Sequence, residues 1–194
     1  MLGKGKCKEF IVDVIIPALI LALLIRTFVI QAFKIPSESM VPTLQIGDHL
    51  FVCKFSYGLK IPFIDKTILK WNSPKRGEII VFRYPEDPKR DFIKRVIGLP
   101  GENFQVVNKE IYINSTHLIE PYKIHNDFYP SVAQFSPRDN WERNKLILSN
   151  KVFVMGDNRD SSLDSRFWGQ LDTNMIKGKA LFIYWPPWRM GLIK

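Results

Sequence analysis

Two serines stand close together in a proline-flanked segment near the amino-terminal end of the chain. Residues 36–44 read PSESMVPTL, with Ser37 and Ser39 two positions apart. Side chains at i and i+2 project to the same side of an extended backbone, so one hydroxyl could attack a carbonyl while the other donates a hydrogen bond. The two prolines fix φ locally and stiffen the segment. A polar linker is the alternative interpretation of this segment taken alone.

Lys94 is the residue whose surroundings would suit a general base. In the stretch DFIKRVI, the strand period of two places Phe92, Lys94 and Val96 on one face. Desolvation between two apolar neighbours disfavours the ammonium form, and lowering the lysine pKa to about 8 would cost roughly 3 kcal/mol. A lysine that is partly neutral near the working pH can accept a proton. The alternative is a lysine that extends to solvent, as most do.

A dense polar loop follows the strand expected at residues 151–155. Residues 156–166 read GDNRDSSLDSR, a run of short polar and charged side chains. Two ion pairs could brace this loop, either Asp164 with Arg166 or Asp157 with Arg159. A serine of the loop, Ser162 or Ser165, could orient another side chain.

No metal ion or cofactor is expected. The two cysteines, Cys7 and Cys53, lie far apart, and no CxxC pair for zinc occurs. The polar loop fails as a calcium-binding EF-hand because Ser162 occupies the position of its glycine. There is no GxSxG elbow, and no SxxK pattern at either serine of the first segment. No pattern indicates a Ser-His-Asp triad among the three histidines.

The elements that must position these residues are mostly short strands. β-branched and aromatic residues bounded by turn residues mark them. We expect strands at residues 49–57, 78–83, 91–97, 104–107, 110–114, 151–155 and 179–185. Because no helical patterns alternate with the strands, the sequence predicts a mostly β, barrel-like or sandwich-like domain.

One segment differs in character from these strands. Residues 115–150 contain prolines, charges and aromatic residues with little periodicity. We interpret residues 101–150 as a small irregular insertion, which divides the β domain into residues 34–100 and 151–194. The tail at residues 185–188, WPPW, could lie at a membrane interface or form an ordered end of the domain.

An apolar stretch precedes the serine segment. Residues 10–33 read FIVDVIIPALILALLIRTFVIQAF. As a helix they would extend about 36 Å, which exceeds a hydrocarbon core of about 30 Å. We predict a single transmembrane helix with Asp13 and Arg26 near its ends. A cleaved signal peptide is disfavoured because no small-residue cleavage site follows, and a buried core helix or an interfacial helix are further alternatives.

Basic residues predict the orientation of this anchor. Three lysines lie among residues 1–9, whereas Lys34 is the only Lys or Arg between the anchor and Lys54. The amino terminus is therefore expected in the cytoplasm, with the rest of the chain outside. The net charge of +9 suggests an anionic partner, either lipid or nucleic acid. Nucleic acid is disfavoured because no helix-turn-helix, zinc or RNP signature occurs.

The chain resembles the bacterial type I signal peptidases from the anchor to nearly its end. Four matching stretches occur in the order found in that family, PSESMVPTLQIGDHLFV, KRGEIIVFRYP, DFIKRVIGLPGE and MGDNRDSSLDSRFWG. The resemblance implies a serine endopeptidase with a Ser-Lys dyad, held in the plasma membrane by one helix. It also implies that the enzyme removes signal peptides from exported preproteins at Ala-X-Ala-like sites.

The same resemblance assigns the catalytic roles. Ser39 matches the nucleophile and Lys94 matches the general base. Ser37 matches the serine whose hydroxyl forms the oxyanion hole together with the Ser39 backbone N–H. The alternative is a specialised or inactive membrane-anchored relative that serves secretion, pilus assembly or conjugation, which the intact pair of Ser39 and Lys94 disfavours.

Supporting roles also follow from the resemblance. Ser162 matches a serine that hydrogen-bonds the catalytic lysine. Asp164 and Arg166 match a supporting ion pair. The candidate walls of the substrate pockets are Ile35, Pro36, Met40, Leu44, Phe92 and Ile93.

Overall fold

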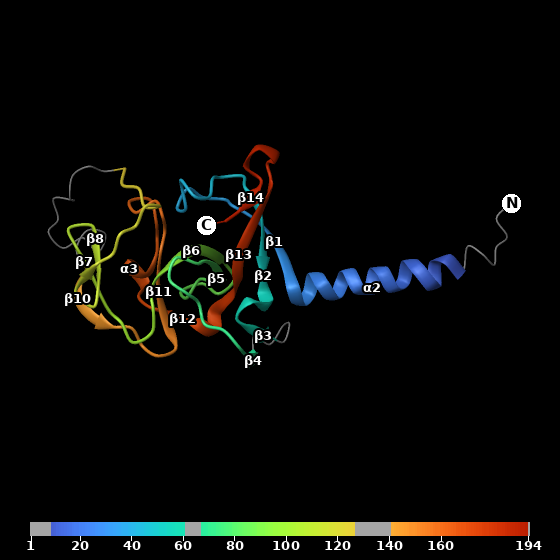
Figure 1. The fold of residues 1–194 in the computed structure, drawn as a ribbon, viewed down its shortest axis with the longest axis horizontal. Helices are drawn as coiled ribbons and strands as arrows, with labels where there is room; N and C mark the ends of the chain where they lie inside the picture. The colour runs from blue at the N-terminus through green and yellow to red at the C-terminus, as the bar shows by residue number, and fades with distance from the viewer. Residues whose placement is uncertain (1–8, 61–66, 127–140, 194) are drawn as a thin grey trace.

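The computed structural model describes residues 9–60, 67–126 and 141–193 (Figure 1). A helical run that begins near residue 9 projects from one side of a β-rich body. The run consists of a π-helical segment at Ile11–Ile15, helix α2 at Ile16–Leu24 and a second π-helical segment at Ile25–Val29. No helix within the described ranges is both long enough and apolar enough to cross a membrane.

The helical run ends earlier than the sequence predicts. Helical backbone stops at Val29, and Ile30 has the extended dihedral angles φ −128° and ψ 136°. Strand β1, Ile30–Lys34, follows and pairs antiparallel with β2, so the prediction of helix through Phe33 is wrong for its last four residues. The β2 partner satisfies the backbone groups that would otherwise continue the helix. As a result, β1 leads directly into the serine segment.

An eight-stranded sheet forms the centre of the body. Its order is β1-β2-β13-β5-β6-β11-β12, with β14 paired to β13, and its pairs are antiparallel. The strands after β1 are β2 His49–Cys53, β5 Ile79–Arg83, β6 Asp91–Gly98, β11 Lys151–Met155, β12 Leu171–Asp172, β13 Ile176–Trp185 and β14 Gly191–Leu192. A separate hairpin joins β3, Gly58–Lys60, to β4, Thr67–Lys70.

The predicted mostly β fold is confirmed, but the predicted barrel-like closure is not observed. Within the described residues, the end strands β1 and β12 do not pair with each other, so the sheet stays open. Strand β12 has only two residues and offers little backbone for a further ladder. Two strand boundaries also differ by more than one residue. The strand expected at 49–57 ends at Cys53, where a 3₁₀ turn begins, and the strand expected at 179–185 begins at Ile176.

Strand β6 lies inside the sheet between β5 and β11, and both of its faces are covered. Residues 93–98 are all buried. Phe92 and Val96 pack in one apolar cluster, whereas Ile93 and Ile97 each pack in a different one. The predicted period of two along this strand is therefore confirmed, and a charged side chain on either face is surrounded by packed side chains.

The segment at 101–150 is more regular than the predicted irregular insertion. A second antiparallel sheet has the order β10-β7-β8-β9 and lies at the end of the body opposite the helix (Figure 1). Its strands are β7 Asn103–Val107, β8 Glu110–Ile113, β9 Thr116–His117 and β10 Trp141–Leu146. Asn108 and Lys109, both with positive φ, make the tight turn of the first hairpin. Residues 127–140 of the predicted insertion lie outside the described residues.

Candidate active site

Ser39 lies in a turn between β1 and β2 that is anchored to the core. Its neighbours Met40 and Leu44 are fully buried, so their side chains hold the turn against the sheet. The Ser39 carbonyl accepts a hydrogen bond from the backbone N–H of Asn158 over 3.2 Å. That bond joins the turn to the polar loop that follows β11. Ser39 itself is only 6% exposed, so it is almost completely buried.

Lys94 lies beside this hydroxyl on central strand β6. Its Nζ donates to Ser39 Oγ over 2.8 Å and to the Ile93 carbonyl over 2.9 Å. The nitrogen also lies 5.3 Å from the centroid of the Phe92 ring, which follows from their shared strand face. Lys94 is 4% exposed. Its contact with Ser39 therefore joins two buried side chains from distant parts of the sequence.

The surroundings of Lys94 favour its neutral form. Burial lowers its pKa to about 8, while the charges of Asp164 and Asp157 partly oppose the shift and that of Arg166 reinforces it. Desolvation outweighs the carboxylates because the ammonium has lost nearly all of its water. A useful fraction of the amine is therefore neutral at mildly alkaline pH and can accept the proton of the neighbouring hydroxyl.

Ser37 also lies close to the nucleophile position. Its Oγ is 3.4 Å from Ser39 Oγ, and its side chain is exposed. The segment is a turn rather than the extended backbone considered in the sequence, yet the two hydroxyls are neighbours. Ser37 is thus within reach of a substrate carbonyl that approaches Ser39 from solvent.

Asp164 and Arg166 form a buried ion pair beside this centre. The guanidinium donates from Nε to Asp164 Oδ1 and from Nη2 to Oδ2, each over 2.9 Å. Asp164 also caps the short helix α3, Ser165–Trp168, and accepts from the Gly156 N–H over 3.0 Å. Burial alone would raise the pKa of Asp164, but Arg166 and the hydrogen bonds outweigh it and hold that pKa below its usual value. The carboxylate therefore remains charged.

Ser162 is buried near this pair but does not meet its predicted partner. The resemblance to the family predicts a hydrogen bond between Ser162 and Lys94. The Lys94 amine instead donates to the Ser39 hydroxyl and to the Ile93 carbonyl. Among the described residues, Ser162 Oγ makes no hydrogen bond to Lys94, and it lies near the Asp164 carboxylate, whose pKa it helps to lower. It packs against Gly156, where an added Cβ would lie 2.3 Å from Oγ, so close backbone contact holds the hydroxyl there.

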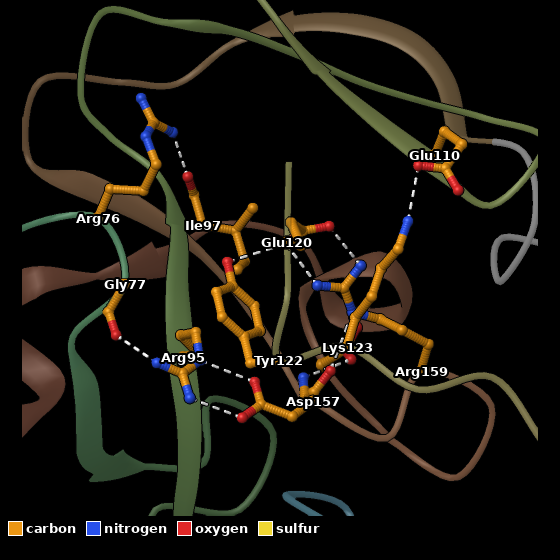
Figure 2. A network of polar contacts seen from close by, with 12 residues as sticks. Arg76, Gly77, Arg95, Ile97, Glu110, Glu120, Tyr122, Lys123, Asp157 and Arg159 are labelled. Carbon is orange, nitrogen blue, oxygen red and sulfur yellow. Dashed lines mark hydrogen bonds and ion pairs between the residues drawn. The ribbon is translucent and has the colours of Figure 1, made fainter. Parts of the chain in front are cut away.

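The alternative ion pair between Asp157 and Arg159 does not form. Asp157 pairs with Arg95 of β6, with nitrogen–oxygen distances of 2.7 and 2.8 Å (Figure 2). Arg159 instead pairs with Glu120, a residue of the 101–150 segment. Both partners lie far away in the sequence, and the loop is therefore braced against two other elements as well as by its own pair of Asp164 and Arg166.

Arg95 is a buried residue beside the site that sequence reasoning missed. Besides Asp157, its guanidinium donates to the Gly77 carbonyl over 2.7 Å and to Thr43 Oγ1 over 3.2 Å. Thr43 Oγ1 in turn donates to Asp157 Oδ2 over 2.6 Å, which fastens the serine turn to β6 and to the polar loop. The available signal was a charged residue between apolar neighbours in a central strand, since such a charge needs a buried partner.

The six predicted pocket residues do not share one surface. Four of them belong to a single apolar cluster beneath the serine turn and are at most 8% exposed, namely Ile35, Met40, Leu44 and Ile93. Pro36 is exposed. Phe92 packs in a different cluster, where its ring stacks on Tyr84 with centroids 4.3 Å apart. Their strand positions explain the separation, because Phe92 and Ile93 face opposite sides of β6.

Within the parts of the chain that the structure describes, no group of three His, Cys, Asp or Glu side chains could hold a metal ion. Cys53 is a free, half-buried thiol at the end of β2.

Comparison with known proteins identifies the family of this chain. The model of the family described as signal peptidase, peptidase S26, matches residues 7–185. Signal peptidase I of Pseudomonas fluorescens is 34% identical over 222 residues, covering 92% of this chain and 76% of that protein. Signal peptidase I of Leptolyngbya laminosa is 41% identical over 181 residues, covering 90% and 78%. A crystal structure of signal peptidase I from Enterococcus faecalis V583 is 30% identical and covers 56% of this chain and 97% of that one, with a TM-score of 0.45.

Proposed function

We propose that this chain, which belongs to the signal peptidase family, peptidase S26, and is a serine endopeptidase, removes signal peptides from exported preproteins. In this proposal Ser39 and Lys94 form the catalytic dyad. One observation carries the proposal. A buried amine with a pKa lowered to about 8 lies 2.8 Å from a serine hydroxyl in a turn anchored to the core. That arrangement supplies a nucleophile and a base at hydrogen-bond distance.

The reaction begins with transfer of the Ser39 proton to neutral Lys94. Ser39 Oγ attacks the scissile carbonyl carbon, and the carbonyl oxygen becomes an oxyanion. The hydroxyl of Ser37 and the backbone N–H of Ser39 donate to that oxyanion, which lowers the barrier because the bonds strengthen as charge develops. Lys94 then gives its proton to the leaving amine, and the carbon–nitrogen bond breaks.

Hydrolysis of the acyl-enzyme completes the cycle. Lys94, neutral again, accepts a proton from water, which attacks the ester carbonyl and releases the signal peptide with a free carboxylate. Ser39 recovers its proton from Lys94. The ion pair of Asp164 and Arg166 supports both steps by fixing the polar loop and the electrostatic field at Lys94.

Substrate selection is proposed to occur above the apolar cluster beneath the serine turn. An extended peptide segment would lie beside the turn, with backbone hydrogen bonds for affinity and alternate side chains directed at the protein. Ile35, Met40 and Leu44 are at most 2% exposed, so they offer little surface to a bound peptide. We propose that this limited surface suits small side chains such as alanine at alternate positions before the cut.

A membrane anchor at the helical run is part of the same proposal. Its large apolar side chains are exposed on every side, as illustrated by Phe10 at 58%, Leu19 at 59% and Leu23 at 52%. Exposed aliphatic side chains of this density favour a lipid environment. The lysines before the run favour a cytoplasmic amino terminus, so the catalytic domain would face outward. The net charge of +9 is compatible with contact between this domain and an anionic lipid surface.

Processing of a preprotein tests this function. The detergent-solubilised full chain is incubated with a purified preprotein, and the new amino terminus of the product is sequenced. The proposal expects one cut after an Ala-X-Ala-like site, absent with Ser39→Ala. A chain that binds preprotein without cutting it would instead be an inactive relative that serves in an assembly.

A further inference from the structure

A buried ion pair joins the 101–150 segment to the polar loop of the site (Figure 2). Arg159 donates from Nη1 to Glu120 Oε2 over 2.8 Å and from Nη2 to Oε1 over 2.5 Å. The Glu120 side chain is 0% exposed and that of Arg159 is 1% exposed. A two-bond contact between a guanidinium and a carboxylate fixes orientation as well as distance. The pair therefore sets where the Arg159 backbone lies.

Backbone contacts hold the two elements together along the same line. Ile124 donates from its N–H to the Asp157 carbonyl over 2.9 Å, and Arg159 donates to the Ile124 carbonyl over 3.0 Å. The Arg95 guanidinium carbon lies over the Tyr122 ring, 4.0 Å from the ring centroid. The Tyr122 hydroxyl donates to Glu120 over 3.1 Å. Residues 120–126 are thus in contact with the loop over several consecutive positions.

Arg159 in turn fixes the two ends of the loop. Its Nε donates to the Gly156 carbonyl over 3.1 Å, and its own carbonyl accepts from Arg166 over 2.5 Å. Arg166 pairs with Asp164, which accepts from the Gly156 N–H. Gly156 lies against the nucleophile, since a Cβ there would come within 2.4 Å of the Ser39 carbonyl oxygen. The contacts run without interruption from Glu120 to the backbone of Ser39.

We infer that Glu120 is a positioning residue for the Ser39 reaction, acting through Arg159 on Gly156 and Arg166. This inference rests on the proposed function, because it assigns Glu120 to the chemistry of Ser39. If the Glu120 charge is removed, Arg159 stays charged in a dry site and must find another carboxylate. Asp164 is a carboxylate that already interacts electrostatically with Arg159. An approach of Arg159 to Asp164 would weaken the Arg166 pair and release Gly156 from its place beside Ser39.

Acylation of Ser39 by an activated ester of an Ala-X-Ala peptide measures this role without any preprotein. The full-length chain in detergent is compared with Glu120→Gln at a temperature where circular dichroism shows both to be folded. The amount of acylated serine counts the competent molecules, and the rate per competent molecule reports positioning. We expect a rate lowered about 10- to 100-fold with KM changed little, since misplacement of a reacting group by about 1 Å has that effect.

Two further variants complete the test. Glu110→Gln is the matched control, because Glu110 forms an ion pair with Lys123 over 2.6 Å in the same segment. Its side chain is 40% exposed, and it is not among the residues that connect Glu120 to Gly156 in the contacts described above. It should keep the wild-type rate. Glu120→Asp retains the charge and should recover part of the loss, and it also serves if Glu120→Gln does not fold.

Three results would overturn the inference. The first is that Glu120→Gln contains fewer competent molecules but that each of them reacts at the wild-type rate. That result would indicate a purely structural role for Glu120. The second is a change in KM alone. The third is a Glu120→Asp rate equal to wild type when Glu120→Gln cannot fold. Failure of the proposed function is a different result, since the wild-type chain itself would then not be acylated at Ser39.

Discussion

The Nζ atom of Lys94 donates to Ser39 Oγ over 2.8 Å in a place where neither residue is more than 6% exposed. When the amine is neutral, the same two atoms can exchange roles, with the hydroxyl donating and the nitrogen accepting. Burial makes that exchange accessible because it lowers the lysine pKa to about 8 against the pull of two carboxylates. The predictions below follow from this contact and its surroundings.

The rate of peptide cleavage should depend on the protonation of Lys94. Because the neutral amine is the base, kcat/KM should rise about tenfold per pH unit below a midpoint near 8 and level off above it. Assays on an Ala-X-Ala peptide across the alkaline range measure the midpoint. Lys94→Arg should be inactive at every pH, since a guanidinium cannot accept the proton. Substantial turnover by Lys94→Arg would rule out the assigned role.

Lys94→Met should be inactive yet more stable than the wild type at neutral pH. The folded chain binds the lysine proton with a pKa of about 8, against an ordinary value of 10.5 when unfolded. Stability therefore rises with pH between these values, because the unfolded state binds more protons there. At neutral pH the buried charge costs up to about 3 kcal/mol, a penalty that an apolar isostere lacks.

Urea unfolding at a series of pH values checks that sign. The difference between Lys94→Met and wild type should be largest below about pH 8 and should disappear above about pH 10.5. Other titrating groups are present in both proteins, so their contributions cancel in the difference between the two free energies of unfolding. A constant difference across this range would mean that Lys94 is not desolvated in the folded protein.

Ser37→Ala should lower kcat strongly and KM little. The Ser37 hydroxyl lies 3.4 Å from Ser39 Oγ, and loss of one oxyanion donor typically costs about 100- to 1000-fold in rate, or roughly 3–4 kcal/mol. Ser37→Thr restores a hydroxyl with an extra methyl and should recover part of the loss. Steady-state kinetics on a short peptide separates the two constants. A rise in KM alone would show that Ser37 positions substrate instead.

The chain should expose its catalytic domain on the outer side of the plasma membrane. A protease added to intact spheroplasts should digest the region after Gln31 while the amino terminus stays protected, because the lysines precede the helical run. Epitope tags at the two ends allow both regions to be followed. Protection of the whole region after Gln31, together with loss of the amino-terminal tag, would reverse the orientation.

The sequence predicts Lys94 well because its environment is largely local. The alternation around it places Phe92 and Val96 on its own face, and both are packed as expected. Burial is the largest cause of its lowered pKa. The proximity of Ser37 and Ser39 is local as well. What the sequence could not supply was the contact between Ser39 and Lys94, since strand register and the course of the turn decide it.

The parts that the sequence missed depend on distant partners. Strand β10 pairs with β7 across more than thirty residues, and no local pattern marks that pairing. The choice of Glu120 for Arg159 and of Arg95 for Asp157 is equally remote, so the loop could only be expected to brace itself. Ser162 is a further case, because its side chain packs against Gly156 and makes no hydrogen bond to Lys94.

Direct identification of the acylated residue tests the central claim most sharply. The full-length chain is treated with an activated Ala-X-Ala peptidyl ester, quenched in acid and analysed by peptide mass spectrometry, alongside Ser39→Ala and Lys94→Met. The account predicts one adduct on the peptide that contains Ser39, at a rate that rises with pH through about 8, with no adduct in Ser39→Ala and very slow acylation in Lys94→Met. An adduct on another residue, or acylation of Lys94→Met at the wild-type rate, would contradict it.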